Sequence, residues 1–91
     1  MVTRTTRIAN RTGFHARPAN LFVEMASRFI SAIHVIHRGQ QANARSVVSL
    51  MLLEATAGAE ITIAADGADE IAAVNALTEL IDREFDEPSS Q

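Results

Sequence analysis

Residues 10–27 read NRTGFHARPANLFVEMAS, and this stretch decides the first half of the fold. Asn10 to Gly13 are turn-forming residues, after which apolar residues recur with the 3.6-residue period of an α-helix. The pattern predicts a helix from Ala16 to about Ser27. Its inward positions are Ala19, Phe22, Val23 and Ala26, and Phe29 and Ile30 continue the same stripe.

Pro18 is compatible with this helix because it falls in the first turn. A backbone N–H at that place has no acceptor within the helix, so the donor that proline lacks costs little. His15 then occupies the position directly before the helix.

Short strands are predicted on both sides of this helix. Residues 2–8 are β-branched and loosely alternating, which predicts a first strand. Alternation also predicts strands at 33–36 and 60–64, and the turn at Arg38–Gln40 predicts a hairpin to a strand near 41–44.

Two further helices are predicted in the second half of the chain. Ser46 precedes the apolar run at 47–53 and is expected to cap a short helix that ends at Ala57–Ala59. Asp69 is expected to cap a last helix, whose inward positions are Ile71, Val74, Leu77 and Ile81.

The resulting order, βαββαβα, predicts an α/β protein of the α+β type. It consists of a four-stranded antiparallel sheet with three helices on one face. At 91 residues the chain has the size of one domain, expected at residues 1–86 with a polar tail at 87–91. Glu84–Gln91 is acidic and polar and is expected to fray. So small a core is not expected to enclose a large pocket, which leaves a small-ligand sensor without support.

The composition excludes several classes of function. The chain has no cysteine, so disulfides, thiolate metal sites and cysteine nucleophiles are excluded. No apolar run approaches the roughly 20 residues of a membrane span, and no secretory signal pattern begins the sequence. We therefore expect a cytoplasmic protein.

Charge is distributed unevenly along the chain. Residues 1–45 hold seven of the eight arginines and a single acidic residue, Glu24, whereas ten acidic residues lie in 46–91. A basic surface built from the first half would suit an anion or an acidic partner. Nucleic acid is disfavoured, because aromatic residues make up only 4% and tryptophan and tyrosine are absent.

His15 and Arg17 are the candidate reactive pair. A histidine at a helix start faces free backbone N–H groups and the positive end of the helix dipole, which favours a neutral ring and a bound anion. Arg17 adds a guanidinium that can fork onto phosphate oxygens. These parts together describe a phosphoryl acceptor. The alternative is that His15 only caps the helix and that Arg17 is merely solvated.

His34 and His37 are three residues apart, and on a strand they point to opposite faces. A metal shared between them is therefore not expected, and we interpret both as surface histidines.

At this point a resemblance to a known family becomes visible. Residues 13–19, GFHARPA, resemble the active-site signature of the histidine-containing phosphocarrier (HPr) family of the phosphotransferase system. Residues 43–48, NARSVV, resemble the segment of the family's regulatory serine, here Ser46, and its interval from His15 agrees with the family. The similarity continues through 58–63 and 66–70, and it covers essentially residues 2–86.

The resemblance implies a fold and an activity. The fold is the HPr-like open-faced sandwich, and the activity is phosphoryl relay rather than enzymatic turnover, with no cofactor. His15 would accept a phosphoryl group on Nδ1 from enzyme I, itself charged by phosphoenolpyruvate. Arg17 would steady the phosphate, and an EIIA-type protein would accept it.

The resemblance also implies regulation and docking. Ser46 matches the position that a kinase/phosphorylase modifies in some lineages, and the alternative is simple capping of its helix. On this helix Leu50 and Leu53 are expected to face the core. The partner-docking residues are expected to be Val47, Val48, Met51 and Arg45.

Two departures from the family pattern concern partner choice. Lysines that are usual on the docking face are absent, with Glu24, Ser27 and Ser49 in their places. Glu54 replaces the usual glycine after the short helix, and its carboxylate is expected near His15 and Arg17, where it would repel a phosphate or pair with Arg17.

Two questions of role stay open at the level of sequence. Residues 77–85 resemble the last helix of the nitrogen-type branch of the family, which regulates rather than imports sugar. A rival function is a regulatory binding module that is controlled by Ser46 phosphorylation and makes no use of His15. A monomer is expected, since a relay presents one face to successive partners.

Overall fold

The structure is a computed structural model that describes residues 1–86. Its elements are β1 (Val2–Arg7), α1 (Ala16–Ala26), β2 (Ala32–His37), β3 (Gln40–Asn43), α2 (Val47–Leu52), β4 (Glu60–Asp66), α3 (Glu70–Asp82) and the 3₁₀ turn η1 (Glu84–Asp86). The predicted order is confirmed. The predicted tail at residues 87–91 lies outside the described residues.

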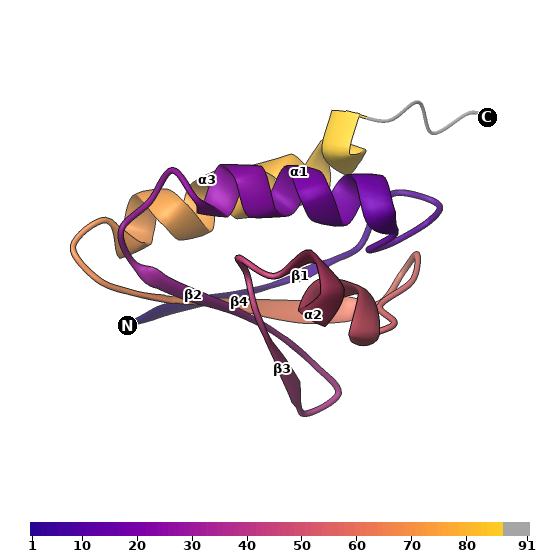
Figure 1. Cartoon of the computed structure of the whole chain (residues 1–91), viewed down its shortest axis with the longest axis horizontal. Coiled ribbons are helices and arrows are strands. Elements are labelled where there is room, and N and C mark those ends of the chain that lie inside the picture. The colour runs from indigo at the N-terminus through magenta and orange to yellow at the C-terminus, as the bar shows by residue number, and fades with distance from the viewer. Residues whose placement is uncertain (87–91) are drawn as a thin grey trace.

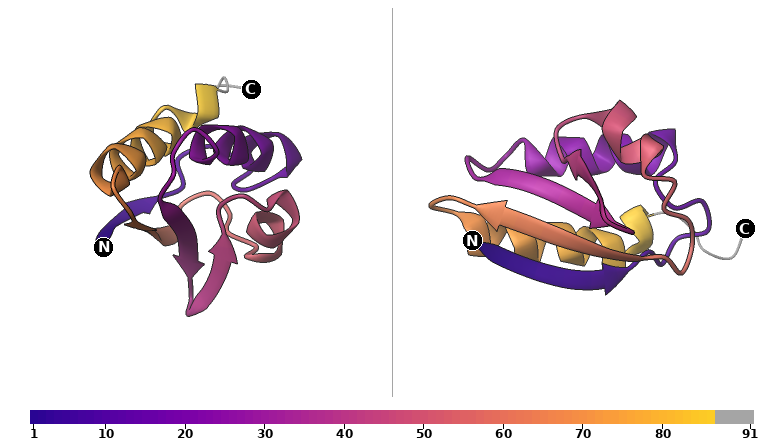
Figure 2. Two further views of the ribbon diagram at one scale, coloured as in Figure 1. Left: turned by 60° about the vertical axis from the view of Figure 1, so that its left-hand side comes forward. Right: turned by 90° about the horizontal axis from the view of Figure 1, so that it is seen from below.

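The four strands form one antiparallel sheet in the order β1-β4-β2-β3. β4 is central and pairs with β1, from Val2 opposite Ala65 to Arg7 opposite Glu60. On its other side β4 pairs with β2 over residues 62–66. α1 and α3 lie side by side over one face of this sheet, and α2 lies beside the first of them (Figure 1). The opposite face carries no helix, as the views in Figure 2 show.

The core lies between the sheet and the helices because alternate residues of the strands point toward α1 and α3. Ile33 and Val35 of β2 and Ile61 and Ile63 of β4 are buried there. The inward stripes of the helices meet them, and the fully buried helical residues include Ala19, Phe22, Ala26, Val74, Leu77 and Ile81.

The predicted hairpin is confirmed as a two-residue turn between β2 and β3. His37 pairs with Gln40, and Arg38 and Gly39 both have positive φ, at 51° and 79°. This backbone belongs to the turn type that best matches the twist of a hairpin, and it favours glycine or asparagine.

Three helical predictions are corrected by the structure. Ile30 and Ile71, expected to face inward, are 79% and 64% exposed. Ile30 follows the end of α1 at Ala26, so helical spacing no longer applies to it. In α3 the first buried residue is Ala73, so the buried face begins after Ile71. Moreover, α2 ends at Leu52 instead of Ala57–Ala59, because Glu54 adopts a left-handed conformation with φ 55°.

The expected fraying from Glu84 onward is also wrong within the described residues. The chain forms η1 there, and Phe85 is buried against Phe14 with ring centroids 5.8 Å apart. A buried aromatic ring gives this segment a packing role that its acidic neighbours in the sequence conceal.

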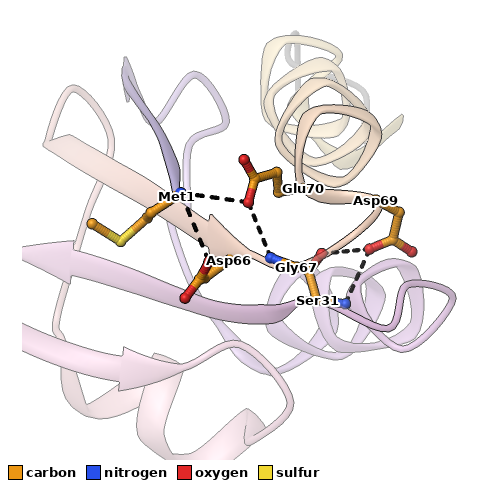
Figure 3. Close-up of polar contacts among 6 residues, drawn as sticks. All are labelled: Met1, Ser31, Asp66, Gly67, Asp69 and Glu70. Carbon is orange, nitrogen blue, oxygen red and sulfur yellow. Dashed lines mark hydrogen bonds and ion pairs between the residues drawn. The ribbon is translucent and has the colours of Figure 1, made fainter.

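Asp69 directly precedes α3 as predicted, but its side chain does not cap that helix. Its carboxylate accepts hydrogen bonds from the N–H groups of Ile30 and Ser31, at 2.9 and 3.0 Å, and from the Ser31 hydroxyl. The Ser31 hydroxyl and the Ile30 N–H lower the pKa of Asp69. Figure 3 shows this carboxylate joining the α1–β2 loop to the start of α3.

Glu70 forms a second contact at the same end of the molecule. Its Oε1 accepts from the N–H of Gly67 at 3.0 Å and lies 3.5 Å from the α-ammonium of Met1 (Figure 3). The Gly67 N–H and this ammonium lower the pKa of Glu70.

Within residues 1–86, none of the helices combines the length and the apolar character that crossing a membrane requires.

Candidate functional site

The loop before α1 is held in place by the contacts of Gly13 and Phe14. Gly13 has φ 65°, and a Cβ there would lie 2.2 Å from the carbonyl oxygen of Ala55, so the close approach requires glycine. The Phe14 N–H donates to that same oxygen at 3.1 Å. The ring of Phe14 is buried edge-to-face against Phe22 at 5.3 Å, and Phe85 covers it from another side. These contacts place the following residue at a defined position.

His15 is the residue that this loop presents. Its backbone is extended (φ −84°, ψ 177°), its N–H donates to the carbonyl of Gly13, and its own carbonyl accepts from the N–H of Ala19. Its side chain is exposed and makes no capping hydrogen bond. The alternative that the imidazole caps α1 is therefore wrong, and in the described chain both ring nitrogens are without a protein partner.

Arg17 lies one residue into α1 and is likewise exposed. Its guanidinium forms no hydrogen bond or ion pair within residues 1–86. The backbone N–H groups of Ala16 and Arg17 also donate to no acceptor in this part of the chain. Pro18 and Ala19 are buried below them, so the first turn is anchored while its donors face outward. The arrangement brings together an imidazole, a guanidinium and free N–H groups, which suits an anion bonded to the ring.

Glu54 does not pair with Arg17, which makes no ion pair in the described residues. Its side chain instead lines a hollow with Arg7, Arg38 and His37. The expected carboxylate–guanidinium contact at the His15 site is therefore absent.

Ser46 caps α2 as predicted. Its Oγ accepts the N–H of Ser49 at 3.2 Å, and its carbonyl accepts the N–H of Leu50 at 3.1 Å. Ser46 is half-buried, so the residue is partly accessible to solvent.

The exposed residues of α2 form an apolar face. Leu50 and Leu53 are buried as predicted, Val47 is half-buried, and Val48 and Met51 are 66% and 39% exposed. Leu52, which the sequence pattern does not assign to this face, is 70% exposed beside them. Helical spacing assigns Leu52 no clear side in so short a helix, so the pattern alone does not identify it.

Arg45 has a structural contact that the sequence does not predict. Its Nη2 donates to the carbonyls of Ala26, Phe29 and Ser31, at 3.2, 2.5 and 3.1 Å. The guanidinium thereby satisfies carbonyls that follow the end of α1, a favourable place for a cation.

The other two histidines are not equivalent. His34 is half-buried on the helix-free face, whereas His37 is buried at 8% exposure on the opposite face, so its interpretation as a surface histidine is wrong. Residues 1–86 contain no group of three histidine or acidic side chains that could hold a metal ion.

Comparison with known proteins relates this chain to one family. Residues 2–83 match the family model described as the phosphorylation site of the HPr component of the phosphotransferase system (PTS). This chain belongs to the HPr family. It is 41% identical to the phosphocarrier protein HPr of Treponema pallidum over 87 residues, which cover 96% of this chain and 99% of the relative. The crystal structure of HPr-C-His from Thermoanaerobacter tengcongensis superposes with a TM-score of 0.93 at 42% identity, covering 97% and 99% of the two chains.

Membership in the HPr family shows that the chain is a phosphocarrier protein of the phosphotransferase system with the predicted open-faced fold. The comparisons do not favour the rival binding module, since the matched relative is named a phosphocarrier. An HPr dimer from Thermoanaerobacter tengcongensis also matches, at 42% identity and a TM-score of 0.77, covering 96% of this chain and all of the other. A monomer and the nitrogen-type branch stay predictions for this chain.

Proposed function

We propose that this chain relays a phosphoryl group on His15, from phosphorylated enzyme I to an EIIA-type acceptor. The observation that carries the proposal is that an exposed imidazole and an exposed guanidinium stand two residues apart at the start of α1, and neither has a partner in the described residues. A surface side chain that is held in place but left without a partner is available for chemistry.

Nδ1 of His15 is the proposed nucleophile. As its lone pair forms the phosphorus–nitrogen bond, the bond between phosphorus and the donor breaks, and the reverse exchange transfers the group to the acceptor's histidine. The protein is changed by each transfer until a partner restores it, so it acts as a carrier and not as an enzyme. No cofactor takes part.

The role proposed for Arg17 is to steady the phosphate. Its planar guanidinium can donate two parallel hydrogen bonds to phosphate oxygens. The N–H groups of Ala16 and Arg17, which have no acceptor within residues 1–86, supply further donors at the positive end of α1.

Docking is proposed at the apolar face of α2, formed by Val47, Val48, Met51 and Leu52. Exposed apolar side chains beside a polar reactive site are typical of a surface that meets protein partners. Arg45 borders this face, although its Nη2 is occupied by backbone carbonyls.

Ser46 is the proposed site of regulation by a kinase/phosphorylase. It begins the helix that carries the docking face, so a phosphate there would place negative charge directly beside that face. We place the whole relay in the cytoplasm, where the donor and acceptor proteins would be met.

The test is phosphorylation of the purified protein with phosphoenolpyruvate and its own enzyme I, followed by intact mass. We expect one acid-labile phosphate in the wild type and none in His15→Ala. His34→Ala is the matched control, because it removes a half-buried histidine from the helix-free face and is expected to keep the phosphate. An unmodified wild type, with enzyme I active on another carrier, would overturn the proposal.

A further inference from the structure

A polar hollow lies at the end of the sheet, beside the segment that follows α2. It has a volume of about 630 Å³ and is lined by Arg7, His37, Arg38, Glu54, Thr56 and Glu60, among others. Three segments line it: the end of β1, the β2–β3 turn and the connection from α2 to β4. Neither His15 nor Arg17 lines it. The hollow lies at the surface, so the small core does not prevent it.

His37 is the buried polar side chain of this hollow. Its Nδ1 lies 3.1 Å from the backbone carbonyl oxygen of Glu60. A carbonyl oxygen only accepts, so Nδ1 must carry the proton, and the neutral ring then has its lone pair on Nε2. This Nε2 has no partner within residues 1–86. The fold therefore holds a fixed hydrogen-bond acceptor among the residues that line the hollow.

Arg38 and Glu54 supply opposite charges to the same place. Both line this hollow and a smaller one of about 230 Å³ beside it. Their side chains form no ion pair with each other, nor with any group in the described chain. Two opposite charges that share a hollow without meeting leave room for a molecule that carries both.

The backbone at these two residues is strained. Arg38 and Glu54 have φ of 51° and 55°, a left-handed conformation that glycine or asparagine adopts more readily. Residues held in this way gather at binding sites, where the position of the side chain matters more than the local cost. Arg7 differs from both, because it donates to the carbonyl of Gly58 at 3.1 Å and lies 4.0 Å from Glu60.

We propose that this hollow binds a small zwitterion of the α-amino acid class. Its carboxylate bonds to Arg38, and its ammonium bonds to Glu54 and to Nε2 of His37. Two arginines and two glutamates line the hollow, so their formal charges cancel. A phosphate dianion would meet as much repulsion as attraction there, whereas a zwitterion matches both signs. The inference is independent of phosphoryl transfer at His15.

The test follows the ring nitrogens of His37 and the backbone amides of Arg38 and Glu54 by NMR in ¹⁵N-labelled protein. Each common L-amino acid is titrated in turn, and at least one is expected to give saturable shifts at all three residues. Its two matched analogues, one lacking the ammonium and one lacking the carboxylate, are expected to bind at least about tenfold more weakly. The absence of any saturating amino acid, or equal shifts from inorganic phosphate, would overturn the proposal.

Two variants separate binding from folding. Glu54→Gly and Arg38→Asn each remove one charge while introducing a residue suited to positive φ, so both are expected to raise the melting temperature. Each is expected to weaken binding of the selected amino acid by at least about tenfold. Arg28→Asn is the control, because it removes an exposed arginine outside the hollow. This variant is expected to bind the selected amino acid as tightly as the wild type does. Unchanged affinity in both hollow variants would refute the site.

Discussion

The two ends of α1 differ in whether their polar groups have partners within the protein. At its C-terminal end, Arg45 donates to three carbonyls and Asp69 accepts from the N–H groups of Ile30 and Ser31, so the backbone polar groups there have side-chain partners. Figure 3 shows how Asp69 reaches the loop from the start of α3. At the N-terminal end, His15 and Arg17 have no partner in the described residues.

This difference separates polar side chains that stabilise the fold from polar side chains that have no partner within residues 1–86. A carboxylate or guanidinium that satisfies buried backbone groups stabilises the protein but is no longer available to a ligand. The position of the His15 end is fixed by the close packing of Gly13 and by the contacts among the rings of Phe14, Phe22 and Phe85. The polar side chains of His15 and Arg17 consequently have no partner in the described residues, as the proposed phosphoryl transfer requires.

The largest effect is expected from removing this support. Phe85→Ala should lower the free energy of unfolding by about 3–5 kcal/mol, since a fully buried ring is lost. Phosphorylation of His15 should slow as well, because Phe14 loses a neighbour. Urea denaturation and the rate of phosphate incorporation measure the two effects. Phe85→Leu, which keeps most of the apolar volume, should lose clearly less, and equal losses in both variants would contradict the packing role.

A smaller effect is expected at the C-terminal end of α1. Arg45→Met should lower the free energy of unfolding by about 1–2 kcal/mol, because three carbonyls lose their donor. Arg28→Met is the control, an exposed arginine whose side chain has no partner in residues 1–86. Urea denaturation of both variants is the measurement, and equal stability would show that the Arg45 contacts add nothing.

Lowering the pH should destabilise the fold through Asp69 and Glu70, which lie near the C-terminal end of α1. Hydrogen bonds from Ser31, Ile30 and Gly67 hold the pKa values of Asp69 and Glu70 below their ordinary range. Such carboxylates stabilise the fold at pH above about 4, and this contribution is lost as pH falls through their lowered pKa values. Urea midpoints measured between about pH 6 and pH 3 should therefore fall, and less steeply in Asp69→Asn. A parallel decline in wild type and variant would assign the effect to other groups.

The smallest effect is expected at His15 and Arg17, the proposed reactive residues. His15→Ala and Arg17→Ala should each change the free energy of unfolding by less than about 0.5 kcal/mol, because both side chains are exposed and without partners in the described chain. Urea denaturation is again the measurement. A loss above about 1 kcal/mol in either variant would show that the N-terminal end is stabilised by its polar side chains after all.

The parts of the fold that could be predicted are those whose signal is local. The capping role of Ser46 follows from its place before an apolar run. The strand at residues 60–64 follows from the alternation of apolar and polar residues there. The position of His15 before α1 follows from the Gly13 turn and Pro18. Each of these needs only a few neighbouring residues.

The parts that could not be predicted depend on contacts between distant segments. Nothing near Arg45 in the sequence shows that its guanidinium meets carbonyls up to 19 residues earlier. Phe85 stands among acidic residues, which conceals that its ring packs against Phe14. Glu54 lines a hollow with Arg38 and has the left-handed backbone that ends α2, and a sequence does not reveal the conformation of one residue.

The contact between Phe14 and Phe85 also bears on how the protein is made. Phe14, beside the histidine proposed to react, is synthesised early, whereas the ring that covers it is added about seventy positions later. β1 likewise cannot pair until β4 has been synthesised, because β4 is its only strand neighbour within residues 1–86. The proposed phosphate site of a nascent chain therefore lacks part of its support until Phe85 has been synthesised and has left the ribosome.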